Sequence, residues 1–283
     1  MSVENTFSSW EDAVAWLRRQ SEQTQLVIDC YYDDPLIKAA ERYWRSEEWS
    51  AVRELLNEIT GKVLDVGAGR GIASYALAKE GLQVTALEPD PSSLVGAAAI
   101  RELAHESALP IAVVEEFSER LPFADASFDV VFARAVLHHT RDLETACREF
   151  FRVLKPGGKL IAIREHVISR TEDLPHFLES HPLHRFYGGE HAYLLQQYVS
   201  AIGQPGFVGL KIITPWQSPL NYAPHKLATL KTELVRRCSH IAGVGYLARV
   251  IFGLPGIWPI VRRILDRVDN RPGRLYSFVA TRP

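Results

Sequence analysis

The sequence has few cysteines, little net charge and no long apolar run. Its 3 cysteines lie far apart and form no CxxC pair, which favours a reduced intracellular setting over a disulfide framework. A net charge of -2 gives no electrostatic reason to expect nucleic acid as the main partner. The most apolar late stretch, 250–261, contains two prolines and is too short to span a bilayer. The first residues lack the basic-then-apolar pattern of a secretory signal, so we expect a cytoplasmic protein.

The composition is that of an ordinary globular protein. Hydrophobic residues make up 47% of the chain and charged residues 23%. A length of 283 residues allows one large domain, or a domain with a sizeable insertion. Residues 1–60 repeat apolar positions at intervals of three and four, with Ser9 before the first such run. This spacing predicts an N-terminal helical segment.

From residue 61 onward, strand-like runs alternate with helix-like runs. Continuous apolar strands separated by helices indicate a parallel sheet that is covered on both faces. We therefore expect a doubly wound, Rossmann-like α/β fold with a seven-stranded, mostly parallel sheet, and with ligands at the carboxyl ends of the strands. The expected strands are 63–66, 84–88, 111–116, 128–133, 159–163, 206–213 and 275–280, and the expected helices are 71–80, 91–106, 141–153 and 190–202.

A largely helical and very apolar stretch, 224–268, separates the last two expected strands. The predicted organisation is therefore a helical segment at 1–60, an α/β domain made of 61–223 and 269–283, and a helical cap at 224–268. Helices that are apolar over much of their circumference must be buried, meet another chain or touch lipid. We favour a lid over an apolar pocket. The alternatives are a helix that lies on a membrane surface, and helices that simply complete the core.

The stretch VLDVGAGRG at 63–71 joins the first expected strand to a helix. Gly67 and Gly69 let the backbone turn sharply and bring a ligand close to main-chain N–H groups. The pattern is GxGxG rather than the dinucleotide fingerprint GxGxxG, because Ile72 stands where the third glycine belongs. Glu88 ends the next strand, where a carboxylate can accept hydrogen bonds from ribose hydroxyls. The turn and the acid together predict an adenosine-type ligand.

Two later segments make this signal more specific. They are LPFADASFDVVFARAVLHH at 121–139 and REFFRVLKPGGKLIAI at 148–163. With the glycine turn and Glu88, they give a chain that resembles the class I S-adenosylmethionine-dependent methyltransferases, in particular the small-molecule subgroup called type 11. The resemblance covers about residues 60–165, and FVATRP at the end matches that family's final antiparallel strand. It implies S-adenosylmethionine as cofactor and a small-molecule substrate.

The resemblance also implies cofactor contacts in four loops. The first motif, from Asp65 to Gly69, matches the segment that holds the methionine part, and Glu88 matches the ribose-binding acid. The loop after the third strand matches the segment along the adenine, although Phe117 stands where the family commonly has Asp. The end of the fourth strand matches the segment that flanks the sulfonium. The implied cofactor-binding residues are Asp65, Gly67, Ala68, Gly69, Glu88, Pro89, Ser118, Glu119, Arg134 and Ala135.

Methyl transfer from a sulfonium is an in-line displacement, so alignment of the reacting atoms supplies much of the catalysis. A general base is required only when the acceptor arrives protonated. Histidines are the best candidates because their pKa lies near neutrality. His139 follows the fourth expected strand and His166 follows the fifth, which makes them the candidate catalytic residues. For His138 we favour a packing role.

The segment HPLHRFYGGEHAY at 181–193 concentrates histidine and tyrosine around a Gly-Gly pair. Loops at this edge of a sheet often line substrate pockets. We therefore expect a substrate lid, with a purely structural loop as the alternative. HxxH on a proline-containing stretch is not a zinc spacing, so we expect no metal. The candidate substrate-binding residues are His184, Tyr187, His191 and Tyr222.

The primary hypothesis is methyl transfer to a small organic molecule with an apolar part, with oxygen preferred to nitrogen and nitrogen to carbon as the accepting atom. One alternative is a lipid or quinone methyltransferase at a membrane surface. Another is a non-catalytic, methyltransferase-like protein that binds the nucleoside without transferring methyl. Neither the acceptor nor the oligomeric state follows from the sequence.

Overall fold

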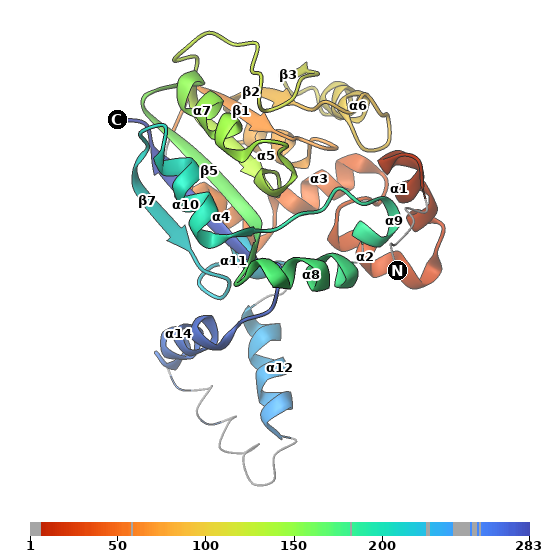
Figure 1. Ribbon diagram of the computed structural model, residues 1–283. Helices are drawn as coiled ribbons and strands as arrows, with labels where there is room; N and C mark the ends of the chain where they lie inside the picture. Colours follow the sequence, from red (N-terminus) through yellow and green to blue (C-terminus); the bar gives the residue numbers. More distant parts are fainter. Residues whose placement is uncertain are drawn as a thin grey trace.

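The computed structural model describes residues 7–57, 59–181, 183–224, 227–239, 250, 254 and 256–283. Most of them form an α/β body around one sheet, and two helices project from this body at the bottom of Figure 1. The strand order is β3-β2-β1-β4-β5-β8-β7, in which β8 is antiparallel to both of its neighbours. The strands are β1 (Lys62–Val66), β2 (Gln83–Leu87), β3 (Ile111–Val114), β4 (Phe128–Arg134), β5 (Leu154–Ile168), β7 (Val208–Ile213) and β8 (Arg274–Thr281).

This arrangement confirms the expected doubly wound sheet of seven, mostly parallel strands. A two-residue strand, β6 (Tyr193–Leu194), also pairs with β5 beside the main path. The chain runs from β1 to β2 and β3 on one side and then returns to β4 on the other. The carboxyl ends of β1 and β4 therefore flank the point where the winding reverses, which is where open α/β sheets bind ligands.

Apolar helix faces cover one side of the sheet through α7 (Leu143–Val153) and α10 (Leu195–Gly203). The buried residues of α7 recur every three or four positions, as an amphipathic helix on a sheet requires. Phe150 of α7 and Tyr198 of α10 belong to the same buried cluster as Leu64 of β1. Burial of these rings against the strands fixes both helices on this face.

The opposite side packs against α3 (Leu36–Trp44), α4 (Glu47–Leu56) and α5 (Ile72–Lys79). Tyr43 and Trp49 are fully buried in the cluster that covers this side. Two of these helices belong to the N-terminal segment, which also contains α1 (Trp10–Arg18) and α2 (Thr24–Asp29). The predicted N-terminal helices are therefore confirmed, and they complete one layer of the core.

Hydroxyl caps begin two of the N-terminal helices. Ser9 accepts a hydrogen bond from the main-chain N–H of Asp12 at the start of α1. Ser46 does the same for Trp49 at the start of α4. Each cap satisfies a donor that the first turn of a helix leaves unpaired.

The predicted helix at 91–106 is partly wrong, because α6 spans only Ala97–Ser107. The six residues before it form turns, in which Asp90 accepts from the N–H of Ser92, and Ser92 accepts from two following N–H groups. Gly96 precedes the helix, and a Cβ there would lie 2.1 Å from the carbonyl oxygen of Asp90. Side-chain bonds to the local main chain have replaced the first helical turns.

Strand β5 is longer than predicted, and this changes the position of His166. The strand was expected at 159–163, but it continues to Ile168, so His166 lies within the strand rather than after it. A register irregularity between Ala162 and Glu165 interrupts the pairing with β8. Arg164, inside this irregularity, has a φ of 64°. Such a bulge turns side chains toward new directions at the edge of a sheet.

Two helices lie between β7 and β8 along the chain, α12 (Leu227–Ser239) and α14 (Ile257–Val268). They project from the α/β body (Figure 1), and Lys231 of α12 lies over the ring of Trp258 of α14. Asp266 of α14 accepts hydrogen bonds from the segment after β7. The predicted cap at 224–268 includes 240–249, which lies outside the described residues, and its role as a lid remains a prediction. None of the helices in the described part of the chain is long and apolar enough to cross a membrane.

A buried carboxylate joins the N-terminal helices to the sheet. Glu48 of α4 is 1% exposed and accepts a hydrogen bond from Arg134 Nε at the end of β4, at 2.6 Å. Arg164 NH1 lies 3.5 Å from the same carboxylate. Burial opposes ionisation of Glu48, but the two guanidinium groups outweigh it and lower the pKa of this carboxyl below its usual value. The ion pairs hold α4 over the carboxyl ends of two strands.

We predict that Glu48→Gln destabilises the protein by about 3–5 kcal/mol, because it leaves Arg134 buried without its counter-charge. Urea unfolding followed by circular dichroism would measure the loss. Glu47→Gln is the matched control, since Glu47 is the preceding residue and is exposed. Equal unfolding midpoints for the two variants would contradict the prediction.

Candidate functional site

A cavity of about 580 Å³ opens at the carboxyl edge of the sheet. Its floor is formed by the loops that follow β1, β2, β3 and β4, and its walls include residues of the N-terminal helices and of the segment 181–190. This volume is within the usual range of small-molecule sites. The lining residues include Tyr31, Tyr32, Gly67, Gly69, Glu88, Ser118, Arg134, His139, His166 and Glu190.

The glycine turn forms one end of the cavity. Gly67 and Gly69 have φ values of 59° and 55°, a region that side chains with a Cβ rarely adopt. A Cβ at Gly67 would lie 2.8 Å from the side chain of Val136. At Gly69, a Cβ would meet none of the described atoms within 4 Å, so this glycine faces open space. The turn thus brings bare main chain to the cavity surface.

Asp65 lies beneath this turn at the end of β1 and is 1% exposed. It accepts a hydrogen bond from Ser74 Oγ of α5 at 2.5 Å. Burial raises the pKa of Asp65 to about 7, although the bond from Ser74 opposes this shift. The carboxyl group connects the strand to the helix that follows the turn.

Glu88 is attached to the same turn by a main-chain hydrogen bond. Its Oε2 accepts from Gly69 N at 2.7 Å, and its Oε1 accepts from Asp90 N at 3.0 Å. Burial raises the pKa of Glu88 to about 7, against the two N–H donors. A carboxylate has about four lone-pair directions, so Glu88 can accept further bonds from a ligand. Pro89 and Ala68 line the cavity beside it.

The loop after β3 is held to the start of α7 through Glu119. Glu119 Oε1 accepts from the N–H groups of Arg141 and Asp142, and Ser118 Oγ donates to Glu119 Oε2. Both Ser118 and Glu119 line the cavity. The guanidinium of Arg141 lies 4.3 Å from the ring centre of Phe117, the position where the family pattern has Asp.

At the end of β4, the cavity is lined by Arg134 and Ala135. Arg134 directs its guanidinium to Glu48 rather than outward. Ala135 has a φ of 57°, and its N–H donates to the carbonyl of Ile163 in β5. The cofactor residues expected from the sequence therefore all lie on the wall of one cavity.

Arg70 fastens the N-terminal segment over the glycine turn. This residue of the turn is 7% exposed and donates to the carbonyls of Tyr31 and Asp33. It also forms an ion pair with Asp34 at 2.6 Å. Tyr31 and Tyr32 consequently form part of the cavity wall. Sequence reasoning missed this role, although an arginine inside a glycine-rich turn was a visible signal.

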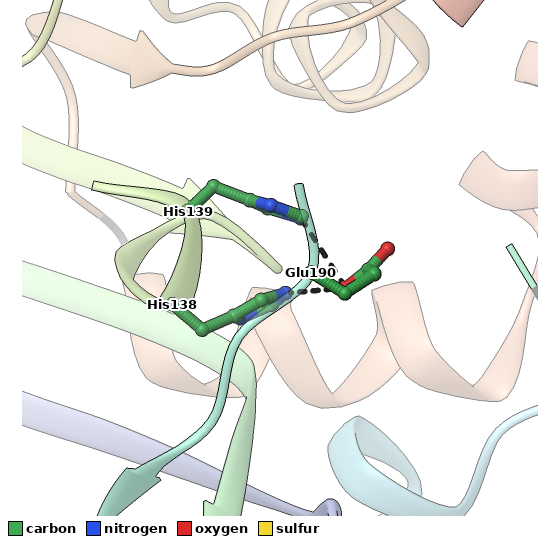
Figure 2. A group of neighbouring side chains, drawn as sticks. All are labelled: His138, His139 and Glu190. Carbon is green, nitrogen blue, oxygen red and sulfur yellow. Dashed lines mark ion pairs between the residues drawn. The ribbon is translucent and has the colours of Figure 1, made fainter. Parts of the chain in front are cut away.

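Four histidines and one glutamate meet at the other end of the cavity. We call His138, His139, His166, His181 and Glu190 the histidine cluster. The ring centres of His138 and His139 are 4.2 Å apart, those of His138 and His166 4.6 Å, and those of His166 and His181 5.2 Å. All five residues line the cavity. Figure 2 shows the rings of His138 and His139 directed toward Glu190.

The candidate catalytic residues, His139 and His166, both belong to this cluster. His139 Nδ1 donates to the Gly189 carbonyl at 2.9 Å, and His166 Nδ1 donates to the Gly273 carbonyl at 2.7 Å. Because a carbonyl oxygen only accepts, the neutral ring in each case carries its lone pair on Nε2. Burial and the positive charge of His138 lower the pKa of both rings.

His138 is held differently. It is 2% exposed, and its Nδ1 donates to Glu165 Oε2 at 2.6 Å. Burial opposes protonation of His138, but the carboxylates of Glu165 and Glu190 outweigh it and raise the pKa of the ring to about 9. Glu165 also accepts from the N–H groups of Val136 and His138, so it is fully engaged beneath the ring.

Of the four candidate substrate residues, Tyr187 lies on the cavity wall and the other three are not among the lining residues. Tyr187 belongs to α9 (His184–Tyr187), and its ring lies 6.0 Å from that of Trp10. His184 is in the same short helix. His191 packs its ring on Tyr193, and Tyr222 ends α11 (Pro219–Tyr222).

Several lining residues were not identified from the sequence. Glu190 and His181 were noted only as part of an unusual loop, and Arg164 was not noted at all. Each of them reaches the site from a segment distant in sequence from the glycine turn. Tyr31 and Tyr32, for which the sequence favours core packing, also line the cavity.

Comparisons with known proteins agree with this geometry. The family model described as "Methyltransferase domain" matches residues 64–162. A demethylmenaquinone methyltransferase of Chlorobaculum tepidum is 36% identical over 120 residues, which are 42% of this chain and 47% of that protein. A tRNA U34 carboxymethyltransferase of Hahella chejuensis is 34% identical over 121 residues, or 42% of this chain and 37% of that protein. This chain thus spans about half the length, or less, of these relatives.

Solved structures share the fold at low identity. A candidate sarcosine dimethylglycine methyltransferase from Galdieria sulphuraria has a TM-score of 0.59 at 21% identity and covers 96% of this chain and 98% of its own. Phosphoethanolamine N-methyltransferase 2 of Haemonchus contortus, in complex with S-adenosyl-L-methionine, has a TM-score of 0.55 at 20% identity, over 92% of this chain and 59% of its own. The [4+2]-cyclase SpnF has a TM-score of 0.54 at 20% identity, over 87% of this chain and 81% of its own.

The match to the family model falls on the strands and loops that build the glycine turn, Glu88 and the end of β4. Strands β7 and β8 come after the matched residues in the chain and complete the sheet in the order 3-2-1-4-5-8-7. Residues 64–162 therefore form a methyltransferase domain of the class I, S-adenosylmethionine-dependent type, and the methyl donor of that domain family is S-adenosylmethionine.

Proposed function

We propose that this protein transfers a methyl group from S-adenosylmethionine to a small organic molecule. One observation carries the proposal: a single cavity runs from the glycine turn and Glu88 to the histidine cluster. The first end has the groups that a nucleoside requires, and the second has groups that can contact an acceptor. A donor and an acceptor bound at the two ends would meet inside one enclosed space.

The cofactor would lie along the loops at the carboxyl edge. We assign the ribose hydroxyls to Glu88, whose carboxylate is fixed by Gly69 N and Asp90 N and retains accepting capacity. The methionine part is assigned to the main chain at Gly67 and Gly69, and the adenine to the loop that carries Ser118. The histidine cluster lines the same cavity, so an acceptor held there would share that cavity with the cofactor.

The reaction is an in-line displacement at the methyl carbon. A bond forms from the acceptor atom to the methyl group as the bond from methyl to sulfur breaks, and the electron pair of that bond stays on sulfur. Holding the reacting atoms in line is the main contribution of the protein. An oxygen acceptor that enters as a hydroxyl must also lose a proton, and we assign its acceptance to His139 or His166, each with a lone pair on Nε2.

Two relatives and one solved structure bear on the identity of the methyl acceptor. The relatives that match part of this chain include a demethylmenaquinone methyltransferase and a tRNA carboxymethyltransferase. The similarity therefore leaves the methyl acceptor open. The net charge of -2 does not favour an RNA. The cyclase SpnF shares the fold as well, which keeps a non-methylating, nucleoside-binding protein as an alternative outcome.

We predict that Glu88→Ala weakens S-adenosylmethionine binding roughly 10- to 150-fold, because hydrogen bonds to a charged acceptor are worth about 1.5–3 kcal/mol. Isothermal titration calorimetry measures the affinity. Glu106→Ala is the matched control, since Glu106 is an exposed carboxylate on α6. Wild-type affinity in Glu88→Ala would remove Glu88 from the site, and the absence of binding to wild type would remove the cofactor assignment.

The pH dependence of binding gives a second, separate prediction. Burial raises the pKa of Glu88 to about 7, and the ionised carboxylate is the stronger acceptor for ribose hydroxyls. Cofactor affinity should therefore increase from about pH 6 to about pH 8 as the carboxyl loses its proton. Calorimetry at several pH values would test this. In Glu88→Gln, the increase of S-adenosylmethionine affinity with pH should become smaller. An equal increase in the wild type and the variant would assign the titration to another group.

A membrane-surface acceptor, such as a lipid or quinone, is the second candidate. It is supported by α14, where Ile260, Ile264 and Val268 are 52%, 53% and 64% exposed and recur every four residues. Such a stripe can enter the headgroup region of a bilayer, and Arg263 and Arg267 on the same helix can meet anionic lipids. The demethylmenaquinone methyltransferase among the relatives agrees with this candidate.

The membrane candidate predicts that the protein sediments with vesicles of phosphatidylcholine and phosphatidylserine at low salt. Ile264→Glu should reduce the bound fraction by roughly tenfold, because burying an isoleucine side chain is worth about 1.5–3 kcal/mol. His105→Glu, on exposed α6, is the control for added charge. A wild-type protein that stays in the supernatant would exclude this candidate and leave the small soluble acceptor.

A further inference from the structure

We propose that His138, His139 and Glu190 bind one divalent transition-metal ion, with Zn²⁺ as the best match to their donor set. Two imidazole nitrogens and one carboxylate oxygen form a set that occurs in catalytic zinc sites. Imidazole ligands also disfavour Mg²⁺ and Ca²⁺, which select oxygen donors. The site departs from our sequence-based expectation of no metal, which considered only the HxxH spacing along one segment.

The distances between the donor atoms support this site. His138 Nε2 lies 3.6 Å and His139 Nε2 3.7 Å from Glu190 Oε2 (Figure 2). These separations are longer than an ordinary hydrogen bond. Donors held by one tetrahedral Zn²⁺ at about 2.0–2.1 Å lie roughly 3.3–3.4 Å apart. The two separations exceed this spacing by about 0.2–0.4 Å, and the three possible ligand atoms all lie within 4.8 Å of one another.

Both histidines are oriented as metal ligands usually are. His138 Nδ1 donates to Glu165, and His139 Nδ1 donates to the carbonyl of Gly189. A ligating histidine commonly donates its other N–H to a carboxylate or a carbonyl, which fixes the ring and places the lone pair on the metal side. The two Nε2 atoms are therefore the ones directed toward Glu190.

The side chain of Glu190 is buried, and one of its oxygen atoms lacks a hydrogen-bond partner among the described residues. Its side chain is 9% exposed, and its Oε2 has no hydrogen-bond partner among the residues that the structure describes. A buried carboxylate oxygen without a partner is costly. Gly188 and Gly189, with φ values of 89° and 77°, carry the chain past His139 and direct the next residue into the cluster.

The balance of charge also calls for a cation. Glu165 and Glu190 both approach His138, and within the described residues the ion pairs of these two carboxylates come from histidines alone. Glu165 accepts three hydrogen bonds, whereas Glu190 Oε2 accepts none from the described residues. A divalent ion balances both carboxylates, which is the condition for keeping them buried.

Two further histidines lie on the other side of Glu190. His181 Nδ1 is 3.8 Å from Glu190 Oε1, and His166 belongs to the same group of possible ligands. We do not include them among the ligands, because they form a separate group with Glu190, and His181 lies nearest Oε1 rather than Oε2. His166 stays available to accept a proton beside the ion.

The ion would have a position open to the cavity, since the side chain of His139 is 42% exposed and lines it. If the proposed methyl transfer is correct, this position takes the oxygen of an alcohol or phenol. A metal held there would lower the pKa of such a hydroxyl. The hydroxyl proton would go to Nε2 of His166, and the oxygen would bond to the methyl carbon as the methyl–sulfur bond breaks, with its electron pair left on sulfur. The further inference thereby favours an oxygen acceptor, and this last step alone rests on the proposed function.

Direct metal binding tests the site. The purified chain, treated with a chelator and dialysed, is titrated with Zn²⁺ by calorimetry, and Co²⁺ provides an optical spectrum of the coordination. We expect one ion per chain with a dissociation constant at or below about 1 µM. His139→Ala and Glu190→Gln should each weaken binding roughly 100-fold or more. His105→Ala, an exposed histidine on α6, should leave it unchanged.

A second test uses a substitution at a residue that is not one of the proposed ligands. Glu165→Gln retains the size of the side chain but loses the charge behind His138, and should weaken Zn²⁺ binding by about 10- to 100-fold. Wild-type affinity in Glu190→Gln, or binding by the wild type no tighter than by His139→Ala, would overturn the site. The affinity for S-adenosylmethionine, measured in parallel, reports the cofactor end separately, so loss of the metal site and loss of the proposed function give different results.

Discussion

A carboxylate removed from water must meet its counter-charges, and in this protein Glu48 meets them on the sheet. Arg134 reaches it from the end of β4, and Arg164 from the irregularity within the neighbouring strand β5. The helix that carries Glu48 cannot move away without leaving three charges buried and unpaired. The N-terminal helices are thus fixed above the carboxyl edge, and the loops that follow the strands become the floor of a cavity instead of an open surface.

The sheet was predictable, and the loops that we assign to the cofactor could be named from the sequence, because the signals of both are local. Strands buried on both faces are continuous apolar runs, and the glycine turn and Glu88 stand directly at strand ends. The start of α6 was not predictable from helical spacing alone, because Ser92 and Asp90 bind the adjacent main chain and delay the helix. The length of β5 was missed for a related reason, since a bulge interrupts its pairing while the strand continues.

The acceptor end could not be assembled from the sequence, because its residues converge only through the fold. His138 follows β4, His166 lies in β5, and Glu190 precedes β6. Along the chain, each looked like an isolated histidine or an ordinary acid. Their relation depends on the pairing of β4 with β5 and on the path of 181–190 across the cavity. Tyr222 illustrates the reverse case, since this candidate substrate residue ends α11 and is not among the residues that line the cavity.

Arg70 has a consequence for how ligands enter. It belongs to the turn that we assign to the cofactor, and its guanidinium donates to the main-chain carbonyls of Tyr31 and Asp33, in a segment that lines the cavity. The glycine turn and the segment that carries Tyr31 are therefore joined through one side chain, and a displacement of the turn would weaken the contacts of that segment. Substitution of Arg70 would therefore act on two walls of the cavity at once, the glycine turn and the segment that carries Tyr31.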